Sequence, residues 1–391
     1  MKTALRAALL CALAICLLAG TALAGAHDSM PFTPKKKADG GKWRIGYLEG
    51  GPYIQYQQTL RATVLSLAKL GWIAPLEIPD FSDPEDTLEM WKFLAGKVRS
   101  DYLEFVGDAH YSSNWDDKLR EENAKKVMAR LAGKPDLDLM IAMGTWAGQD
   151  LANKNHRVPT EVMSTSNPLD AKIIASLDDS GLDHLHARID PDRYKRQVRL
   201  FHDIVGFTRL GIVYENTVAG RSYAAVDDVE LVAKERGFSI VPCTTPLDVP
   251  DANLAYKNLQ ACHDKLADKV DALYLTENGG MRADRMPALL APIFKNKIPT
   301  FSQAGSDDVR YGVLLSIAQA GFKYVGEYHA KVIGQILNGA SPRKLSMVFE
   351  DPPKIAINLK TAELIGFDPP VDILMAADEI YENIEMAKPA P

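Results

Sequence analysis

Short apolar runs alternate with longer amphipathic segments along most of the chain, and this alternation constrains the fold more than any other feature. In the first half the apolar runs are 43–48, 102–109, 137–143 and 159–168. Helical patterns cover about 52–70 and 118–134, and the acidic, proline-containing stretch 77–93 is predicted to be a local elaboration. Such alternation is typical of strands in a parallel sheet that are connected by helices. It predicts one α/β lobe.

The same alternation begins again near residue 209. Strands are predicted at 209–215, 238–243, 270–276 and 298–302, and helices at 219–236, 253–268 and 283–296. A second α/β lobe of similar size is therefore expected. Open α/β sheets bind ligands at the carboxyl ends of their strands, so two such lobes predict a binding cleft between them.

The first 24 residues have the composition of a signal peptide. Lys2 and Arg6 precede an apolar run that ends in the small-x-small pattern of Ala22 and Ala24, which suits signal peptidase. We therefore expect export to the periplasm and cleavage near Ala24, with 25–41 as a flexible leader. An uncleaved membrane anchor is the alternative, although the run is somewhat short for a membrane span.

Composition and charge are those of an ordinary folded protein. Of the 391 residues, 47% are hydrophobic and 25% are charged, and the formal net charge of −6 is spread without a basic stripe. Nucleic acid is therefore not expected as a partner.

Cys243 and Cys262 are the cysteines of the part expected to be exported. In an oxidising compartment they either form one bridge or remain two buried thiols.

Small polar side chains and aromatic rings follow the predicted strands, in stretches such as "GTWAG" (144–148), "STSNP" (164–168) and "TENGG" (276–280). Hydroxyl and amide groups can orient a small polar molecule, while Trp and Tyr can cover its flat part. The candidate ligand-binding residues are Glu49, Tyr53, Thr145, Trp146, Ala147, Ser164, Ser166, Asn167, Tyr214, Asn216, Glu277, Asn278 and Ser302.

The apolar run 137–143 leads directly into "GTWAG", which has the pattern of a helix start. Unpaired backbone N–H groups and the positive end of the helix dipole favour a bound anion, so a ligand carboxylate is predicted beside Thr145. Glu277 can accept hydrogen bonds from an ammonium group, and Trp146 or Tyr53 can cover a planar side group. An amino acid would satisfy both requirements.

Each of these residues also has a simpler interpretation. Thr145 can be an ordinary helix cap, Trp146 a core aromatic residue, and 277–280 only a turn. Their joint occurrence at equivalent strand ends favours a binding site.

The sequence contains no recognisable catalytic or metal-binding motif. It lacks a Gly-x-Ser-x-Gly elbow and a phosphate-binding glycine loop that ends in Lys-Ser or Lys-Thr. His184 and His186 would share one face of a strand, but no third ligand is near in sequence. A solvated strand edge is therefore expected rather than a zinc site. Neither a cofactor nor a metal nor a catalytic residue is predicted.

The second half contains "VDALYLTENGG", "KIPTFSQAGS", the stretch 312–345, and "IAINLKTAELIGFDPP" followed by "ADEIYE". Together with "AMGTWAGQDLA" and "SNPLDA", these stretches resemble the substrate-binding proteins of ABC transporters, specifically the family associated with tryptophan and tyrosine uptake. The resemblance covers about residues 137–383, whereas 49–57 and 71–115 depart from the family pattern.

This resemblance implies the type I periplasmic binding protein fold, with two Rossmann-like lobes of parallel sheets joined by a three-crossing hinge. Lobe 1 would comprise 42–182 with a return segment at about 318–350. Lobe 2 would comprise 183–317 with a return segment at about 351–386. It also implies that lobe 1 holds the ligand's carboxylate at 145–147, with hydroxyl groups from 164–167. Lobe 2 would contribute from Asn216, Glu277 and Asn278.

The function expected from these features is a non-enzymatic periplasmic receptor of an ABC importer. It would close on a small carboxylate, an amino acid with an aromatic or apolar side group, and deliver it to a permease in the inner membrane. One alternative is an exported α/β enzyme that acts on small amino-acid-like substrates. Another is a ligand-binding subunit that signals to a membrane sensor.

Overall fold

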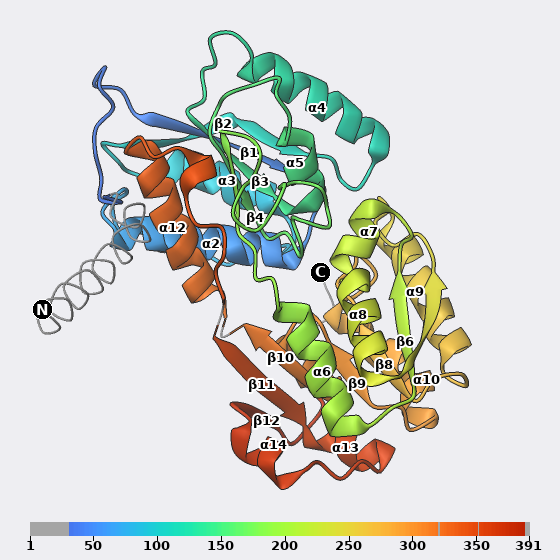
Figure 1. Cartoon of the computed structure of the whole chain (residues 1–391). Coiled ribbons are helices and arrows are strands. Elements are labelled where there is room, and N and C mark those ends of the chain that lie inside the picture. Colours follow the sequence, from blue (N-terminus) through green and yellow to red (C-terminus); the bar gives the residue numbers. More distant parts are fainter. Residues whose placement is uncertain (1–30, 320, 351, 388–391) are drawn as a thin grey trace, which may run out of the picture.

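The computed structural model of the protein describes residues 31–319, 321–350 and 352–387. Within these residues the chain forms two α/β lobes, each built around its own sheet, which lie one above the other in Figure 1. Every strand pair is parallel except one antiparallel pair in the second sheet. The predicted fold class is confirmed.

Lobe 1 contains a five-stranded sheet of order β2-β1-β3-β4-β5 among the described residues. Its strands are β1 (Trp43–Glu49), β2 (Leu103–Ser112), β3 (Leu139–Met143), β4 (Thr160–Met163) and β5 (Leu185–Ala187). Its helices are α2 (Ile54–Lys69), α3 (Thr87–Lys97), α4 (Asp117–Leu131), α5 (Gly144–Leu151) and α12 (Phe322–Leu337), followed by the short η2 (Pro342–Lys344). Every residue of β3 is buried, as expected for an apolar strand whose sheet is covered on both faces.

Lobe 2 contains a seven-stranded sheet of order β12-β11-β10-β9-β8-β6-β7 among the described residues. Its strands are β6 (Arg209–Tyr214), β7 (Ser239–Thr244), β8 (Ala272–Leu275), β9 (Thr300–Ser302), β10 (Leu315–Gln319), β11 (Pro353–Asn358) and β12 (Glu379–Tyr381). Its helices are α6 (Arg193–Val205), α7 (Val218–Tyr223), α8 (Val226–Arg236), α9 (Ala252–Leu266), η1 (Ala283–Arg285), α10 (Met286–Lys295), α11 (Ser306–Arg310), α13 (Leu359–Ile365) and α14 (Val371–Ala376). A disulfide joins Cys243 on β7 to Cys262 on α9, which decides between the two alternatives left open by the sequence.

The chain passes between the lobes three times: after β5, after β10 and before β11. Two of these passages run side by side, because the Ile189 N–H donates to the Met347 carbonyl at 2.8 Å and the Phe349 N–H donates to the Ile189 carbonyl at 2.9 Å. β5 pairs with β4, so the first sheet extends beyond the expected lobe boundary at 182 to Ala187. The return helix α12 packs along α2 of lobe 1, and the return strand β11 pairs with β10 of lobe 2.

The described part of the expected flexible leader lies against lobe 1. The Trp72 indole N–H donates to the Phe32 carbonyl at 2.8 Å, and the Asn338 amide donates to the carbonyls of Pro31 and Thr33 at 2.6 and 2.9 Å. These contacts fix residues 31–33, contrary to the prediction of flexibility. The predicted signal peptide lies outside the described residues. None of the helices in the described part of the chain is long and apolar enough to cross a membrane.

The helix predicted over 219–236 is instead two helices, α7 and α8. Ala225 lies between them with φ of 49°, a left-handed conformation that ends one helix and turns the chain into the next. The sequence "YAAVDD" contains no glycine or proline, so no residue-level signal indicates this break. In contrast, the expected elaboration 77–93 ends in the regular helix α3, which Asp86 caps by accepting from the Leu88 N–H at 2.7 Å.

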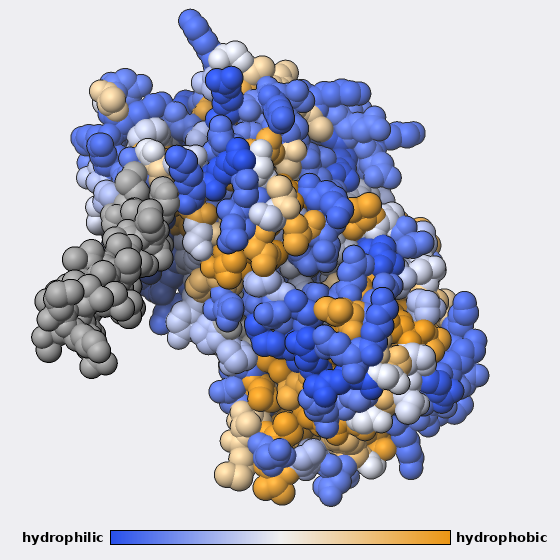
Figure 2. All heavy atoms as spheres, viewed as in Figure 1, coloured by the Kyte–Doolittle hydropathy of each residue, from blue (hydrophilic) through white to orange (hydrophobic). Residues whose placement is uncertain are grey.

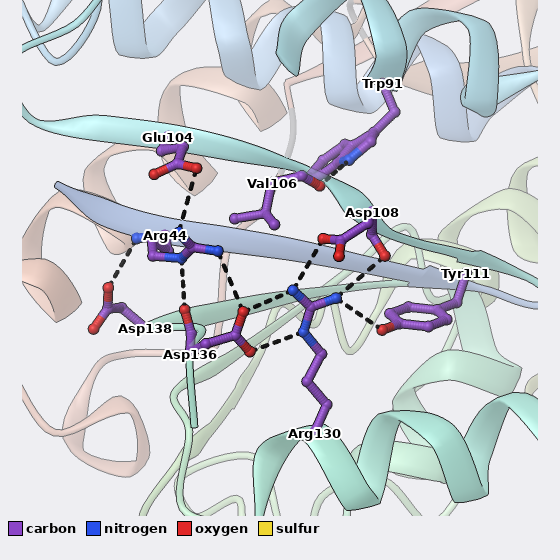
Figure 3. Close-up of polar contacts among 9 residues, drawn as sticks. All are labelled: Arg44, Trp91, Glu104, Val106, Asp108, Tyr111, Arg130, Asp136 and Asp138. Carbon is purple, nitrogen blue, oxygen red and sulfur yellow. Dashed lines mark hydrogen bonds and ion pairs between the residues drawn. The ribbon is translucent and has the colours of Figure 1, made fainter. Parts of the chain in front are cut away.

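A network of charged side chains fixes the arrangement of the lobe 1 strands (Figure 3). Arg44 on β1 donates to the Asp136 carbonyl at 2.7 Å. Arg130 on α4 donates to the Asp136 carboxylate at 2.7 Å, to Asp108 at 3.0 Å and to the Tyr111 hydroxyl at 3.1 Å. Arg44 and Asp136 stand at the amino ends of β1 and β3, so the network lies away from the edge where a ligand is expected. We assign it a structural role.

The surface in the view of Figure 2 is mainly hydrophilic, with hydrophobic side chains gathered across the middle of the molecule and over the lower part of lobe 2. The exposed apolar residues of α13 and α14 include Leu364, Val371 and Met375, of which Met375 is 84% exposed. They lie at the end of the lobe that is distant from lobe 1 in Figure 1.

Candidate ligand-binding site

A cavity lies between the lobes, at the carboxyl ends of β1, β3 and β4 on one side and of β8 on the other. It contains about 410 Å³ of space between atoms, part of which is open to solvent. We call it the aromatic chamber, and its lining residues are Pro52, Tyr53, Tyr56, Trp115, Thr145, Ser164, Ser166, Tyr223, Asp248, Glu277, Asn278 and Gly279. The lobes touch around it: the Gln55 amide donates to Glu277 at 3.3 Å, and the Ser222 hydroxyl donates to the Asn167 carbonyl at 3.0 Å.

The start of α5 forms part of the lobe 1 wall. β3 ends at Met143, and Gly144 then adopts φ of +82° and begins the helix, which brings Thr145 into the chamber. A Cβ atom on Gly144 would lie 1.8 Å from the Tyr56 hydroxyl. The glycine is therefore required both by its backbone conformation and by the close approach of the Tyr56 side chain. No side chain caps α5, so its first N–H groups are not used by a capping side chain, and Thr145 in this first turn lines the chamber.

Aromatic side chains cover much of the same wall. The Tyr53 and Tyr56 rings meet edge to face at 5.3 Å between centroids, and Tyr56 lies 6.4 Å from Trp115. Trp115 is fixed by its indole N–H, which donates to the Pro52 carbonyl at 3.0 Å. A Cβ atom on Gly51 would lie 2.5 Å from the Trp115 ring, so this strand end needs a glycine for the ring to approach. The result is a rigid aromatic surface.

The loops after β7 and β8 form the lobe 2 wall. The backbone N–H of Glu277 donates to the Gln303 side chain at 3.0 Å. The Glu277 carboxylate lies 3.6 Å from the Arg193 guanidinium. The Asn278 amide is used within the loop, donating to the Thr276 carbonyl at 2.9 Å. Asp248 comes from the loop after β7, and its own backbone N–H donates to Glu215 at 3.2 Å.

Two carboxyl groups, those of Asp248 and Glu277, line the aromatic chamber. Burial, together with the nearby Glu215 charge, raises the pKa of Asp248 to about 7. Burial also raises the pKa of Glu277, while Arg193 acts in the opposite direction. Among the described residues, no Lys, Arg or His lines this chamber. A cationic group of a ligand would therefore find two carboxyl groups and several aromatic faces, and at Glu277 it would share the carboxylate with Arg193.

The structure brings six of the predicted ligand-binding residues together at this chamber: Tyr53, Thr145, Ser164, Ser166, Glu277 and Asn278. The others lie elsewhere. Trp146 stands behind Trp115 at 5.4 Å between ring centroids and stacks on Arg120, and Ala147 packs in the lobe 1 core. Tyr214 packs in the lobe 2 core, and Asn216 is exposed on the loop before α7.

Three further predicted residues use their side chains for contacts inside one lobe. Asn167 accepts from the Leu169 and Asp170 N–H groups at 3.1 and 3.2 Å and so closes the turn after β4. Ser302 donates to Asp308 at 2.6 Å. The Glu49 carboxylate accepts hydrogen bonds from Tyr47 and Thr87, both at 2.7 Å, within lobe 1.

Four lining residues were not among the predicted ligand-binding residues: Tyr56, Trp115, Tyr223 and Asp248. Tyr223 belongs to the polar stretch that follows β6, and Trp115 to the aromatic stretch that follows β2, so their places near strand ends were a usable signal. Tyr56 is one helical turn after Tyr53 on α2. Asp248 is separated from β7 by Thr245 to Leu247, and nothing in its sequence context indicates that the loop returns to the cleft.

The strand that carries His184 and His186 is not a solvated edge. His186 is fully buried, with Nδ1 at 2.7 Å from Glu161, and the other Glu161 oxygen lies 2.6 Å from His329. His184 packs against His156 at 4.3 Å between ring centroids. The edge is covered where the chain returns to lobe 1, because η2 packs on β5 and His329 of α12 contacts Glu161 on β4. No group of three or more potential metal ligands occurs among the residues that the structure describes.

These features define a two-lobed α/β binding protein with an interlobe cleft, the type I periplasmic binding protein fold. The chain belongs to the ABC transporter substrate-binding protein family, whose model matches residues 109–381, more than half of the chain. Proteins of this family and fold bind small molecules, work with an ABC transporter and are not enzymes. No curated protein matches the chain.

Solved structures share the fold at low sequence identity. A Streptococcus pneumoniae ABC domain in complex with L-Trp has a TM-score of 0.63 at 19% identity, covering 86% of this chain and 99% of that chain. A conserved domain protein from Vibrio cholerae has a TM-score of 0.64 at 17% identity, with 87% and 99% covered. A ligand-free, open substrate-binding protein from Clostridium difficile has a TM-score of 0.53 at 18% identity, with 87% and 100% covered.

Proposed function

We propose that this protein is the periplasmic receptor of an ABC importer for an amino acid with a planar or apolar side group. The observation that carries the proposal is the aromatic chamber itself, in which a helix start from lobe 1, aromatic rings from both lobes and two carboxyl groups from lobe 2 line one space. Each of these three elements matches one part of such a ligand.

The ligand's carboxylate binds at the start of α5. The first N–H groups of a helix are unpaired and carry partial positive charge, and the Thr145 hydroxyl is a further donor at the same place. Thr145 is 1% exposed, so an anion bound there is shielded from water. In such surroundings hydrogen bonds to a charged group are stronger than at the surface.

The ligand's ammonium group binds between Glu277 and Asp248, and its side group lies against Tyr56 and Trp115. The ammonium compensates the buried carboxylates, whose raised pKa values reflect the cost of burying their charge. The aromatic rings supply large contact areas at small entropic cost. The L-Trp complex of the Streptococcus pneumoniae protein supports a ligand of this size and class for the fold.

The protein is exported, cleaved near Ala24, and delivers its ligand to a permease in the inner membrane. Closure of two lobes around a ligand gives the permease a shape that differs from that of the open protein.

An exported enzyme for small amino-acid-like substrates would need a nucleophile and a base within hydrogen-bond reach of a bound substrate. A receptor that signals to a membrane sensor would use the same closed shape. A permease reading frame next to the gene for this protein would favour transport over sensing.

The test is a thermal-shift screen of the mature protein against the twenty amino acids, nucleosides and simple sugars, followed by calorimetry. We expect an aromatic or large apolar amino acid to stabilise the protein most. If sugars or nucleosides stabilise the protein and no carboxylate does, the assignment of ligand class is wrong.

A further inference from the structure

The Tyr223 side chain carries an unpaired hydroxyl group at the aromatic chamber. Tyr223 is the last residue of α7 in lobe 2 and lines the chamber. Its hydroxyl oxygen is shielded from solvent and has no hydrogen-bond partner among the described residues. Buried hydroxyl groups normally have partners, because leaving one unsatisfied costs free energy. The unpaired hydroxyl therefore indicates a group that is bound in the chamber when the protein works.

The hydroxyl lies on the chamber side of the Tyr223 ring. Burial, the nearby Asp248 carboxyl group and the Tyr56 hydroxyl together raise the pKa of Tyr223 well above its usual value. Asp248 and Tyr56 both line the chamber, so the hydroxyl that responds to them is directed toward the same space. With a raised pKa the group stays a neutral O–H donor at physiological pH. A charged oxygen atom is the acceptor that satisfies such a donor best.

A single side chain sets the position of Tyr223 relative to Glu277. The Gln303 amide nitrogen donates to the Tyr223 carbonyl at 2.6 Å, and the Gln303 amide oxygen accepts from the Glu277 N–H at 3.0 Å. Gln303 is fully buried, so both hydrogen bonds are protected from water. Tyr223 and Glu277 are therefore held together as parts of one wall of lobe 2.

The end of α7 is also close to the proposed carboxylate site in lobe 1. α7 lies against α5, and the Ser222 hydroxyl donates to the Asn167 carbonyl of lobe 1 at 3.0 Å. Arg120 donates to the Trp146 carbonyl in α5 at 3.3 Å. The same Arg120 acts on the pKa of Tyr223 in the downward direction, which places the Tyr223 hydroxyl within electrostatic range of this part of lobe 1.

We propose that the Tyr223 hydroxyl is the lobe 2 donor for the ligand's carboxylate, opposite the Thr145 hydroxyl and the start of α5. This inference rests on the proposed function and names the residue by which lobe 2 recognises the carboxylate. The carboxylate and the ammonium group of an amino acid are attached to the same carbon atom, so their sites must adjoin. Tyr223 meets this condition, because its hydroxyl is near both Asp248 and α5.

A carboxylate that is held from both lobes favours the closed state, since the open protein cannot make both sets of contacts. Tyr223 thereby determines specificity: a solute that lacks the carboxylate gains nothing from this hydroxyl.

The first experiment tests whether the hydroxyl lacks a partner in the protein itself. The mature protein is freed of bound solute by unfolding and refolding, and thermal unfolding is compared for Tyr223→Phe and Tyr274→Phe. Tyr274 is the matched control, because its buried hydroxyl donates to Gln197 at 2.7 Å. We expect Tyr274→Phe to lower the melting temperature and Tyr223→Phe not to lower it, since only the first removes a hydrogen bond. An equal fall in both variants would overturn the inference.

The second experiment identifies the group of the solute that the hydroxyl binds. Each amino acid is compared with the amine that differs from it only by the missing carboxylate: tryptophan with tryptamine, phenylalanine with phenethylamine, and leucine with isoamylamine. Calorimetry measures the affinities, and the concentration dependence of the melting temperature measures those of weakly bound amines. We expect Tyr223→Phe to weaken the amino acid about tenfold and to leave the amine unchanged.

Tyr256→Phe is the matched control for binding, because it removes a lobe 2 hydroxyl that donates to Gln260 within α9, and it should change neither affinity. An equal loss for the amino acid and its amine would show that Tyr223 binds another part of the solute. No loss for either would show that Tyr223 does not bind the solute. Both results overturn the inference and leave the proposed function intact. If the unaltered protein binds none of these amino acids, the proposed ligand class is wrong and the inference fails with it.

Discussion

Two carboxyl groups near the cleft, Glu49 and Asp248, have the same raised pKa of about 7 but different partners. Glu49 is 2% exposed and accepts hydrogen bonds from Tyr47 and Thr87. Asp248 instead lines the aromatic chamber. In both cases burial is the main cause of the shift, but only Asp248 can gain a cationic partner from a ligand. Glu49 is therefore a structural residue of lobe 1.

Glu49→Gln should change how stability depends on pH. The pKa of Glu49 is about 7 in the folded protein and about 4.5 without the fold, so between these values the folded protein keeps a proton that the unfolded chain releases. The stability contribution of this group is thus full below pH about 4.5 and is lost as pH rises to about 7. Thermal unfolding at several pH values should show the variant gaining stability relative to the unaltered protein over this window. A difference that does not vary with pH would contradict the assigned pKa shift.

Thr145→Ala should weaken the binding of a carboxylate ligand. The loss of one charge-assisted hydrogen bond at a buried site costs about 1–3 kcal/mol, or roughly 5- to 150-fold in affinity. Calorimetry with the amino acid found by the screen measures this, and Thr145→Ser, which keeps the hydroxyl, is the control. Equal affinities of Thr145→Ala and the unaltered protein would place the carboxylate elsewhere.

At the residue scale, the sequence predicted the lining residues that directly follow a strand better than it predicted the lining residues that reach the chamber through a loop. Thr145 and Glu277 directly follow strands, and strand ends of one sheet meet at one edge. Asp248 reaches the chamber through the path of a loop, and that path depends on contacts with the rest of lobe 2. Trp146 shows the opposite case: it also follows a strand, but its position in the helix turns the ring behind Trp115.

At the scale of elements, the return of α12 to lobe 1 depends on a close contact with α2. A Cβ atom on Gly326 would lie 2.5 Å from the backbone carbon of Ala62. The helices can approach this closely only because residue 326 has no side chain. The contact matters for function, because α2 carries Tyr56 into the aromatic chamber and α12 follows directly from a passage between the lobes.

Gly326→Ala should therefore destabilise the protein by about 1–3 kcal/mol, the usual cost of inserting atoms into a packed interface. Chemical unfolding monitored by tryptophan fluorescence measures the change. Gly96→Ala is the matched control, because Gly96 lies in α3 with no atom within 4 Å of an added Cβ. This control should be stabilised by up to about 1 kcal/mol. Equal effects of both substitutions would show that the helix contact is looser than described.

Most strands and helices could be predicted from the periodicity of apolar residues, because that periodicity is what buries them. The exceptions have local causes that the pattern does not contain. The break at Ala225 is a backbone turn made by residues that normally continue a helix. Residues 31–33 show no apolar periodicity, yet the side chains of Trp72 and Asn338 donate hydrogen bonds to their carbonyl groups.

At the scale of the whole molecule, the three passages and the few polar contacts across the cleft set the balance between open and closed lobes. The described interlobe contacts at the cleft include Gln55 with Glu277 and Ser222 with the Asn167 carbonyl. Closure also buries the carboxylates of Asp248 and Glu277, which opposes it. A ligand that supplies an ammonium group removes this cost, so it favours the closed state through its differential affinity.

Small-angle X-ray scattering should therefore show a decrease in the radius of gyration when the amino acid found by the screen is added, and the ligand should be recovered unchanged. A sugar that fails to stabilise the protein is the matched additive control and should leave the scattering unaltered. Gln55→Ala removes one contact across the cleft but no carboxylate, so it should shift the ligand-free protein further toward the open state. Because the ligand's charge compensation remains, saturating ligand should still close this variant. An unchanged radius of gyration with bound ligand would refute closure, and steady conversion of the ligand to a product would refute the receptor function.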